Sequence, residues 1–107
     1  MDLFLKVCKA LADGTRLEIL KLLMHKPFCV NAIAKRFGIS QSAVSQHLRV
    51  LREAGLVEGN KEGYFVHYSV NNEGLELFHK KANKILDPAS YPNDICDDNH
   101  KKCNKKC

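Results

Sequence analysis

The chain has 107 residues, of which 45% are hydrophobic and 27% are charged, and its formal net charge is +5. This length suits one globular domain rather than two, and no apolar run approaches the roughly 20 residues that a membrane-spanning helix needs. Residues 1–7 include Asp2 and Lys6 and lack the apolar stretch of a signal peptide. We therefore expect a cytoplasmic protein without a membrane partner.

Charge and cysteine are distributed unevenly along the chain. Residues 1–86 contain 13 Lys and Arg against 8 Asp and Glu, whereas residues 87–107 contain 4 Lys and 4 Asp. A basic excess in the first part favours a polyanionic partner. The second part holds three of the five cysteines and few apolar residues. We predict one domain over residues 1–86, followed by a flexible tail over residues 87–107 that is rich in Cys and Lys.

Apolar residues recur at helical spacing in four successive segments. The spacing predicts helices over residues 2–12, 15–24, 30–37 and 41–54. Asp13 and Ser40 are suitable N-caps for the second and fourth helices, and Gly38 suits the C-terminus of the third. A three-residue turn, residues 38–40, separates the third helix from the fourth. Two helices joined in this way are typical of a helix-turn-helix.

The fourth helix has one apolar and one polar face. At 100° per residue, Val44, Leu48 and Leu51 share the apolar face. The opposite face carries Ser42, Ser45, Gln46, Arg49 and Glu53. Gln pairs with adenine, Arg with guanine, and Ser with either base or with a phosphate. Such a face also suits a helix that is merely exposed to solvent, but the helix order and the turn length favour DNA reading. Gln41, near the helix N-terminus, is then expected to contact a phosphate.

After Gly55 the pattern becomes that of β-strands. Residues 56–57 and 64–70 flank a turn-rich segment, residues 60–63, which predicts a hairpin, or wing. Lys61, at the expected tip, could reach a phosphate or the minor groove, and an ordinary exposed lysine is an equal alternative. Asn72 is the expected N-cap of a last helix over residues 73–86, which has a broad apolar face. The predicted fold is mainly α with a small β-hairpin, a winged helix-turn-helix in the order α-α-α-α-β-β-α.

Three segments carry a resemblance to a known family. They are ALADGTRLEIL at residues 10–20, SQSAVSQHLRVLREAGLV at residues 40–57 and EGYFVHYS at residues 62–69. They closely resemble the ArsR/SmtB family of bacterial winged-helix repressors. The resemblance implies a homodimer that pairs its first and last helices, binds a palindromic operator on double-stranded DNA and leaves it when an effector binds. The broad apolar face of the last helix also needs a partner, which agrees with a dimer.

The resemblance bears on two further residues. His47 matches a histidine that is common in the recognition helix of the family, and its place beside the polar face favours packing or a phosphate contact over base reading. Tyr64 stands where many relatives have Arg, which weakens any role of this wing in placing a cation in the minor groove. We expect no enzymatic activity, because the chain offers no nucleophile-base pair, glycine-rich phosphate loop or plausible carboxylate pair.

The effector is less clearly indicated. The arsenic-responsive Cys-Val-Cys pattern of the family appears here as Cys29-Val30-Asn31, so one thiol remains where As(III) or a soft metal takes two or three. The zinc site that the family has at its last helix needs a second histidine beside His79, and we expect that site to be absent. The tail offers a Cys₃His ligand set that suits Zn, Cd, arsenite or antimonite, formed by Cys96, His100, Cys103 and Cys107.

Together with Cys29, the tail residues are the expected metal or thiol sensor. Three alternatives stay open. The tail cysteines could be fortuitous in a disordered segment, or an oxidant or persulfide could act on a thiol switch, such as one that pairs Cys29 with Cys96. The chain could also be a metal-buffering or protein-interaction module that has lost DNA binding. Cys8 lies on the apolar side of the first helix, which predicts a buried structural thiol.

Overall fold

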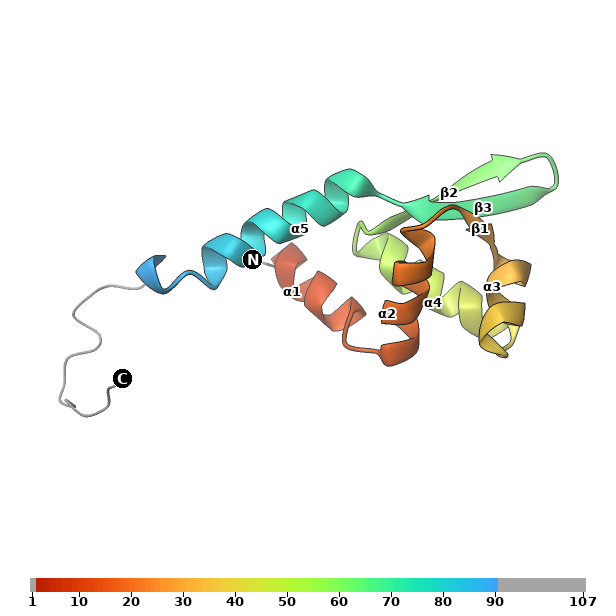
Figure 1. Ribbon diagram of the computed structural model, residues 1–107, viewed down its shortest axis with the longest axis horizontal. Coiled ribbons are helices and arrows are strands. Elements are labelled where there is room, and N and C mark those ends of the chain that lie inside the picture. The colour runs from red at the N-terminus through yellow and green to blue at the C-terminus, as the bar shows by residue number, and fades with distance from the viewer. Residues whose placement is uncertain (1, 91–107) are drawn as a thin grey trace.

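The computed structural model describes residues 2–90 (Figure 1). Its elements are α1 (Asp2–Ala10), α2 (Gly14–Leu23), β1 (Phe28–Cys29), α3 (Val30–Phe37), α4 (Gln41–Glu53), β2 (Val57–Glu62), β3 (Phe65–Val70) and α5 (Asn72–Ile85), with a 3-10 turn at Pro88–Ser90. The predicted winged helix-turn-helix is confirmed, with one additional strand, β1. None of the helices among the described residues is long and apolar enough to cross a membrane.

Local capping explains where the central helices begin and end. The Asp13 carboxylate accepts a hydrogen bond from the Arg16 backbone N–H at 3.0 Å, and the Ser40 hydroxyl accepts one from Ala43 N–H at 3.0 Å. Both predicted N-caps are therefore confirmed. Gly38 ends α3 in the left-handed conformation with φ 67°, which glycine adopts without steric cost. An N-cap side chain such as that of Asp13 or Ser40 contributes about 1 kcal/mol.

The first and last helices differ in detail from the prediction. The helix α1 ends at Ala10, two residues earlier than the spacing indicated. The N-cap of α5 is Asn71, whose side-chain oxygen accepts a hydrogen bond from Gly74 N–H at 3.3 Å, and Asn72 is the first helical residue. Two consecutive asparagines are equally good caps by residue type. The fold selects Asn71, because its own N–H is already bonded to the Leu56 carbonyl at 2.8 Å.

The three strands form an antiparallel sheet in the order β1-β3-β2. The pairing of β2 with β3 runs from Val57 opposite Val70 to Glu62 opposite Phe65, so the turn between them has two residues, Gly63 and Tyr64. Gly63 has a φ of 66°, as tight hairpin turns require. The prediction of a longer turn at residues 60–63 was wrong. Lys61 consequently lies within β2 and not at the tip.

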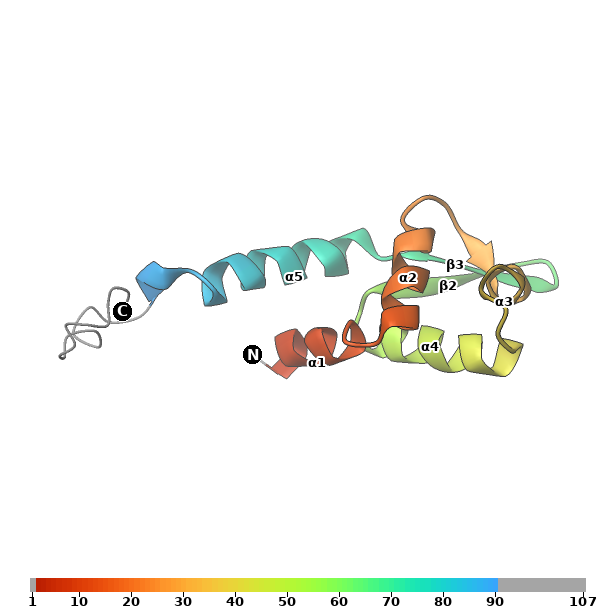
Figure 2. The ribbon, with the colours of Figure 1, turned by 60° about the horizontal axis from the view of Figure 1, so that its bottom comes forward.

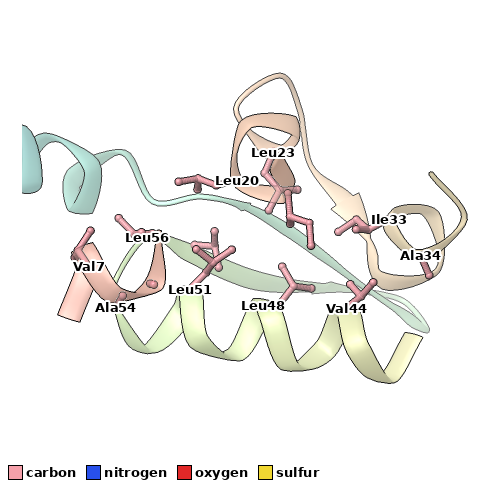
Figure 3. Packing of buried hydrophobic residues seen from close by; sticks show 13 residues of the cluster. Val7, Leu20, Leu23, Ile33, Ala34, Val44, Leu48, Leu51, Ala54 and Leu56 are labelled. Atoms are coloured by element: carbon pink, nitrogen blue, oxygen red, sulfur yellow. The ribbon is translucent and has the colours of Figure 1, made fainter. Parts of the chain in front are cut away.

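A single hydrophobic core fills the space between α4, α2, α3 and the sheet (Figure 3). Its largest fully buried side chains are Ile19, Leu20, Ile33, Val44, Leu48, Leu51 and Leu56. Figure 3 shows Leu48 and Leu51 rising from α4 toward the other elements. Each such leucine contributes about 1.5–3 kcal/mol by leaving water. The core therefore fixes the rotation of α4 about its own axis, which decides which side chains face outward.

The helix α5 extends away from this core beside α1, and the wing tip lies at the opposite end of the molecule (Figures 1 and 2). No residue of α5 is buried, although the rings of Phe78 and Phe4 stack with centroids 5.2 Å apart. Phe4, Val7 and Ala10 form the buried side of α1. Cys8 is exposed, so its expected burial was wrong. Cys8 follows Val7 directly and is therefore rotated by about 100° from it around the helix axis, outside the narrow buried side of α1.

Candidate nucleic-acid interface

The two faces of α4 are separated as the sequence predicted. Val44, Leu48 and Leu51 are at most 1% exposed, and the opposite face is open to solvent. One shallow hollow on that side is lined by Ser42, Ser45, Gln46, Arg49, Arg52 and Tyr68. The structure thus brings the four predicted base-reading side chains together. It adds Arg52 of α4 and Tyr68 of β3.

The guanidinium of Arg49 is partly engaged within its own helix. Its Nε lies 3.7 Å from Glu53 Oε2, and both side chains are more than half exposed. An exposed ion pair four residues apart on a helix stabilises by only about 0.3–0.5 kcal/mol. Glu53 therefore orients Arg49 in the free protein without preventing the guanidinium from reaching a nucleic acid.

Gln41 occupies the first turn of α4 and connects it to α3. Its side-chain amide donates a hydrogen bond to Asn31 Oδ1 at 3.1 Å, and both residues are exposed. The N-terminus of α4 carries the positive end of the helix dipole, which favours an anion there. The position of Gln41 suits the phosphate contact expected from the sequence, which stays a prediction.

His47 flanks the polar face of α4 and contacts Arg16 near the start of α2. A terminal guanidinium nitrogen of Arg16 is 3.2 Å from His47 Nδ1, and Arg16 Nε donates to the Ala10 carbonyl at 2.7 Å. The pKa of the nearby Asp13 carboxyl lies below its usual value, first because of its hydrogen bond from Arg16 N–H and also because of the positive charge of Arg16. His47 is half-buried, as expected for a packing role.

The wing ends in aromatic residues instead of a cation. Tyr64 is fully exposed and Phe65 is 60% exposed, while Lys61 pairs with Val66 in the ladder and is exposed. In the sequence, Tyr64 stands out only as a departure from the family, and its place at the tip was not predicted. A glycine followed directly by two aromatic residues was the available signal, because Gly63 is the residue that can form the tight turn.

Cys29 belongs to β1 and pairs with His67 of β3. It is half-buried and lines a hollow with Asn31, Gln41 and the wing residues Tyr64, Phe65 and Val66. On the same face of the sheet, His67 Nδ1 is 3.4 Å from Glu62 Oε1, without the alignment of a hydrogen bond. The structure therefore puts the Cys29 thiol between the N-termini of α3 and α4 and the wing.

The residues of the chain that the structure describes do not form a metal site. Residues 2–90 contain no group of three or more His, Cys, Asp or Glu arranged to hold an ion. One thiol does not suffice for As(III) or a soft metal, so Cys29 alone does not fit such a group. The other predicted sensor residues, Cys96, His100, Cys103 and Cys107, lie outside the described residues.

Comparison with known proteins agrees with this architecture. Residues 13–59 match the family described as bacterial regulatory protein, arsR family. The transcriptional repressor SdpR of Bacillus subtilis is 37% identical over 70 residues, which cover 65% of this chain and 78% of SdpR. A homolog of the cadmium resistance transcriptional regulatory protein CadC, from Staphylococcus aureus, is 37% identical over 78 residues, covering 72% of this chain and 64% of that protein.

A solved structure extends the similarity to three dimensions. The homodimeric winged helix-turn-helix DNA-binding domain Mb0332 of Mycobacterium bovis, a possible ArsR-family regulator determined by solution NMR, superposes with a TM-score of 0.67 and 36% identity, covering 79% of this chain and 82% of that one. SdpR and the CadC homolog are regulators of transcription. The chain described here belongs to the ArsR/SmtB family of winged helix-turn-helix transcriptional regulators.

Proposed function

We propose that this protein is a repressor that binds a palindromic operator as a homodimer, with α4 of each copy in the major groove. The observation that carries the proposal is the exposed face with Ser42, Ser45, Gln46 and Arg49, on a helix whose other face is fixed in the core. These side chains can pair with base edges. A two-fold dimer places two such helices about one DNA turn apart.

The exposed apolar surface of α1 and α5 supports the homodimer. Leu3, Leu5 and Leu77 are 45%, 50% and 43% exposed, and no residue of α5 is buried. A second copy of the chain is the proposed occupant, because the M. bovis relative is homodimeric. We expect pairing of α1 and α5 across the two-fold axis, which leaves α4 of both copies free.

Phosphate contacts on either side of the groove complete the proposed interface. We assign these contacts to Gln41 at the N-terminus of α4, to His47 and to Lys61 of β2. Gln41 and Lys61 are exposed and His47 is half-buried. Such contacts fix the register of the protein on DNA and carry no sequence information.

Selection of duplexes from a randomised DNA library tests this function. The full chain should enrich a palindromic sequence, and its affinity for the enriched duplex should fall steeply with salt as counterions return to the phosphates. Enrichment of no sequence, together with salt-independent binding, would refute the proposal. That result would favour the alternative of a metal-buffering or protein-interaction module that has lost DNA binding.

We further propose that a thiol-reactive effector releases the protein from DNA. Arsenite, antimonite, Zn and Cd are the proposed ions, with Cys29 and the tail residues Cys96, His100, Cys103 and Cys107 as the sensor. Cys29 supports this role because it lines a hollow with Gln41 and the wing, where an added group would disturb the interface. The S. aureus relative is a homolog of a cadmium resistance regulatory protein, which also favours a soft ion as effector. An oxidant or persulfide acting on the same thiols is the second candidate.

Replacing Cys29, Cys96, Cys103 and Cys107 together by serine should abolish release of the enriched duplex by the active effector, because serine is a poor ligand for soft ions and forms no disulfide. Fluorescence anisotropy of the labelled duplex, titrated with arsenite, zinc, cadmium and a persulfide donor, measures the release. Cys8→Ser is the matched control, since Cys8 is an exposed thiol outside the proposed sensor, and it should respond as the native chain does. Normal release from the fourfold variant would contradict the assignment.

A further inference from the structure

One side chain connects three elements at the corner where α1, α2 and α4 meet. Arg16 of α2 donates through Nε to the carbonyl of Ala10, the last residue of α1, at 2.7 Å. A terminal nitrogen of the same guanidinium lies 3.2 Å from His47 Nδ1 in the middle of α4. His47 is the neighbour of Gln46 in the sequence, so this contact acts directly beside the polar face.

The chemistry of arginine decides the protonation state of His47 in this contact. A guanidinium has five N–H donors and no acceptor, so Nδ1 of His47 must be the acceptor. The imidazole is then neutral and carries its proton on Nε2. Protonation would place a second N–H donor and a second positive charge against Arg16. The Arg16 contact is therefore lost when His47 becomes a cation.

The charged groups near His47 come from α2 and the turn before it. Arg16 faces it directly, and the Asp13 carboxylate interacts with it electrostatically. Within residues 2–90, neither Lys6 nor Lys9 of α1 makes a hydrogen bond or an ion pair with His47. Asp13 stays ionised across the range in which an imidazole titrates, because its pKa lies below its usual value.

We propose that Arg16 and neutral His47 act as positioning residues, which hold α4 at a fixed angle to α1 so that Gln46 and Arg49 meet the bases. This inference rests on the proposed function, because α1 belongs to the proposed dimer surface and α4 to the proposed DNA surface. In the dimer, this guanidinium then adds a polar link between the end of α1 and α4 to the packing of the core. Neutral His47 also keeps an Nε2 donor for a phosphate oxygen.

The proposal predicts an effect of pH opposite to that of a simple phosphate contact. A protonated histidine that only touches a phosphate would strengthen DNA binding as the pH falls, through its added positive charge. If His47 must be neutral to accept from Arg16, acidification that protonates the imidazole should instead weaken binding, because the Arg16 contact is lost. Loss of a hydrogen bond to a charged group corresponds to roughly a tenfold decrease in affinity.

The test compares affinity for the enriched duplex between about pH 8 and about pH 5.5 in the native full chain and in His47→Asn. The asparagine oxygen replaces Nδ1 as an acceptor and does not titrate. Each variant is compared with itself across pH. On acidification, the factor by which affinity falls should be roughly ten times larger for the native chain than for His47→Asn. His25→Asn, which removes an exposed histidine that follows α2, should follow the native profile.

Replacement of Arg16 by Met completes the test. Without the guanidinium, protonated His47 faces no cation, so acidification should no longer weaken binding more than it does in His47→Asn. Equal pH profiles for the native chain and His47→Asn, or native binding that strengthens in acid relative to that variant, would overturn the positioning role. If Arg16→Met does not fold, as judged by circular dichroism, the native and His47→Asn profiles decide alone. Failure to enrich any duplex would instead count against the proposed function.

Discussion

Replacing both Gln46 and Arg49 with alanine should lower the affinity for the enriched duplex by about 1–3 kcal/mol for each base contact that is lost. Both side chains line the hollow on the outer face of α4, and neither belongs to the core. The helix should therefore keep its place while the base-reading groups disappear. Titration of the duplex by fluorescence anisotropy, alongside a scrambled duplex of equal length, measures the affinity and the specificity together.

The scrambled duplex separates reading of bases from attraction to phosphates. Binding to it should change less, because most phosphate contacts are assigned to other residues. Lys21→Ala is a matched control for Arg49, since Lys21 is likewise an exposed cation in a helical ion pair, with Glu18 at 3.9 Å. It should leave the specificity unchanged. Unaltered discrimination between the two duplexes in the double variant would show that α4 does not read the bases.

Gly74→Ala should destabilise the protein by about 1–3 kcal/mol, as over-packing in a tight interior typically does. A Cβ on Gly74 would overlap the backbone carbonyl oxygen of Gly55, which ends α4 with a φ of 80°. A carbonyl oxygen cannot rotate out of the way as a flexible side chain can. The first turn of α5 would have to move, together with its Asn71 cap. Urea unfolding followed by circular dichroism measures the change in the free energy of unfolding.

Gly14→Ala is the matched control for this substitution. Gly14 also lies in the first turn of a helix, its φ is not positive, and no heavy atom lies within 4 Å of an added Cβ. Alanine there should be neutral or stabilise by about 0.4–1 kcal/mol, through the lower entropy of the unfolded chain. Similar free energies of unfolding for the two variants would show that α5 tolerates a Cβ against Gly55.

The parts of the fold that could be predicted are those set by local chemistry. Asp13 and Ser40 cap helices through hydrogen bonds to residues three positions ahead, and such pairs are visible in the sequence. The period of Val44, Leu48 and Leu51 fixed the inner face of α4. The strand β1 could not be predicted, because two residues have no periodicity and their pairing depends on β3, far along the chain.

The candidate site likewise combines features that follow from local sequence with features that arise only from packing. The exposed face of α4 follows from its own periodicity, whereas the contact between Arg16 and His47 spans 31 positions and arises only when α2 packs on α4. The predicted position of Lys61 was wrong because residues 60–63 suit a four-residue turn by composition. The strand register instead closes the hairpin at Gly63 and Tyr64. The burial of Cys8 was predicted wrongly because the periodicity of apolar residues does not show how much of the helix surface its neighbours cover.

The lack of any buried residue in α5 has a consequence for how the regulator responds to its own abundance. The apolar side of α5 is only partly covered by α1. If a second copy covers the rest, association and ordering of this helix become coupled, and the apparent stability rises with protein concentration by mass action. A cell that makes little of the protein would then hold mostly single chains that are weakly structured at one end. Occupancy of DNA would rise more steeply than in proportion to the number of chains.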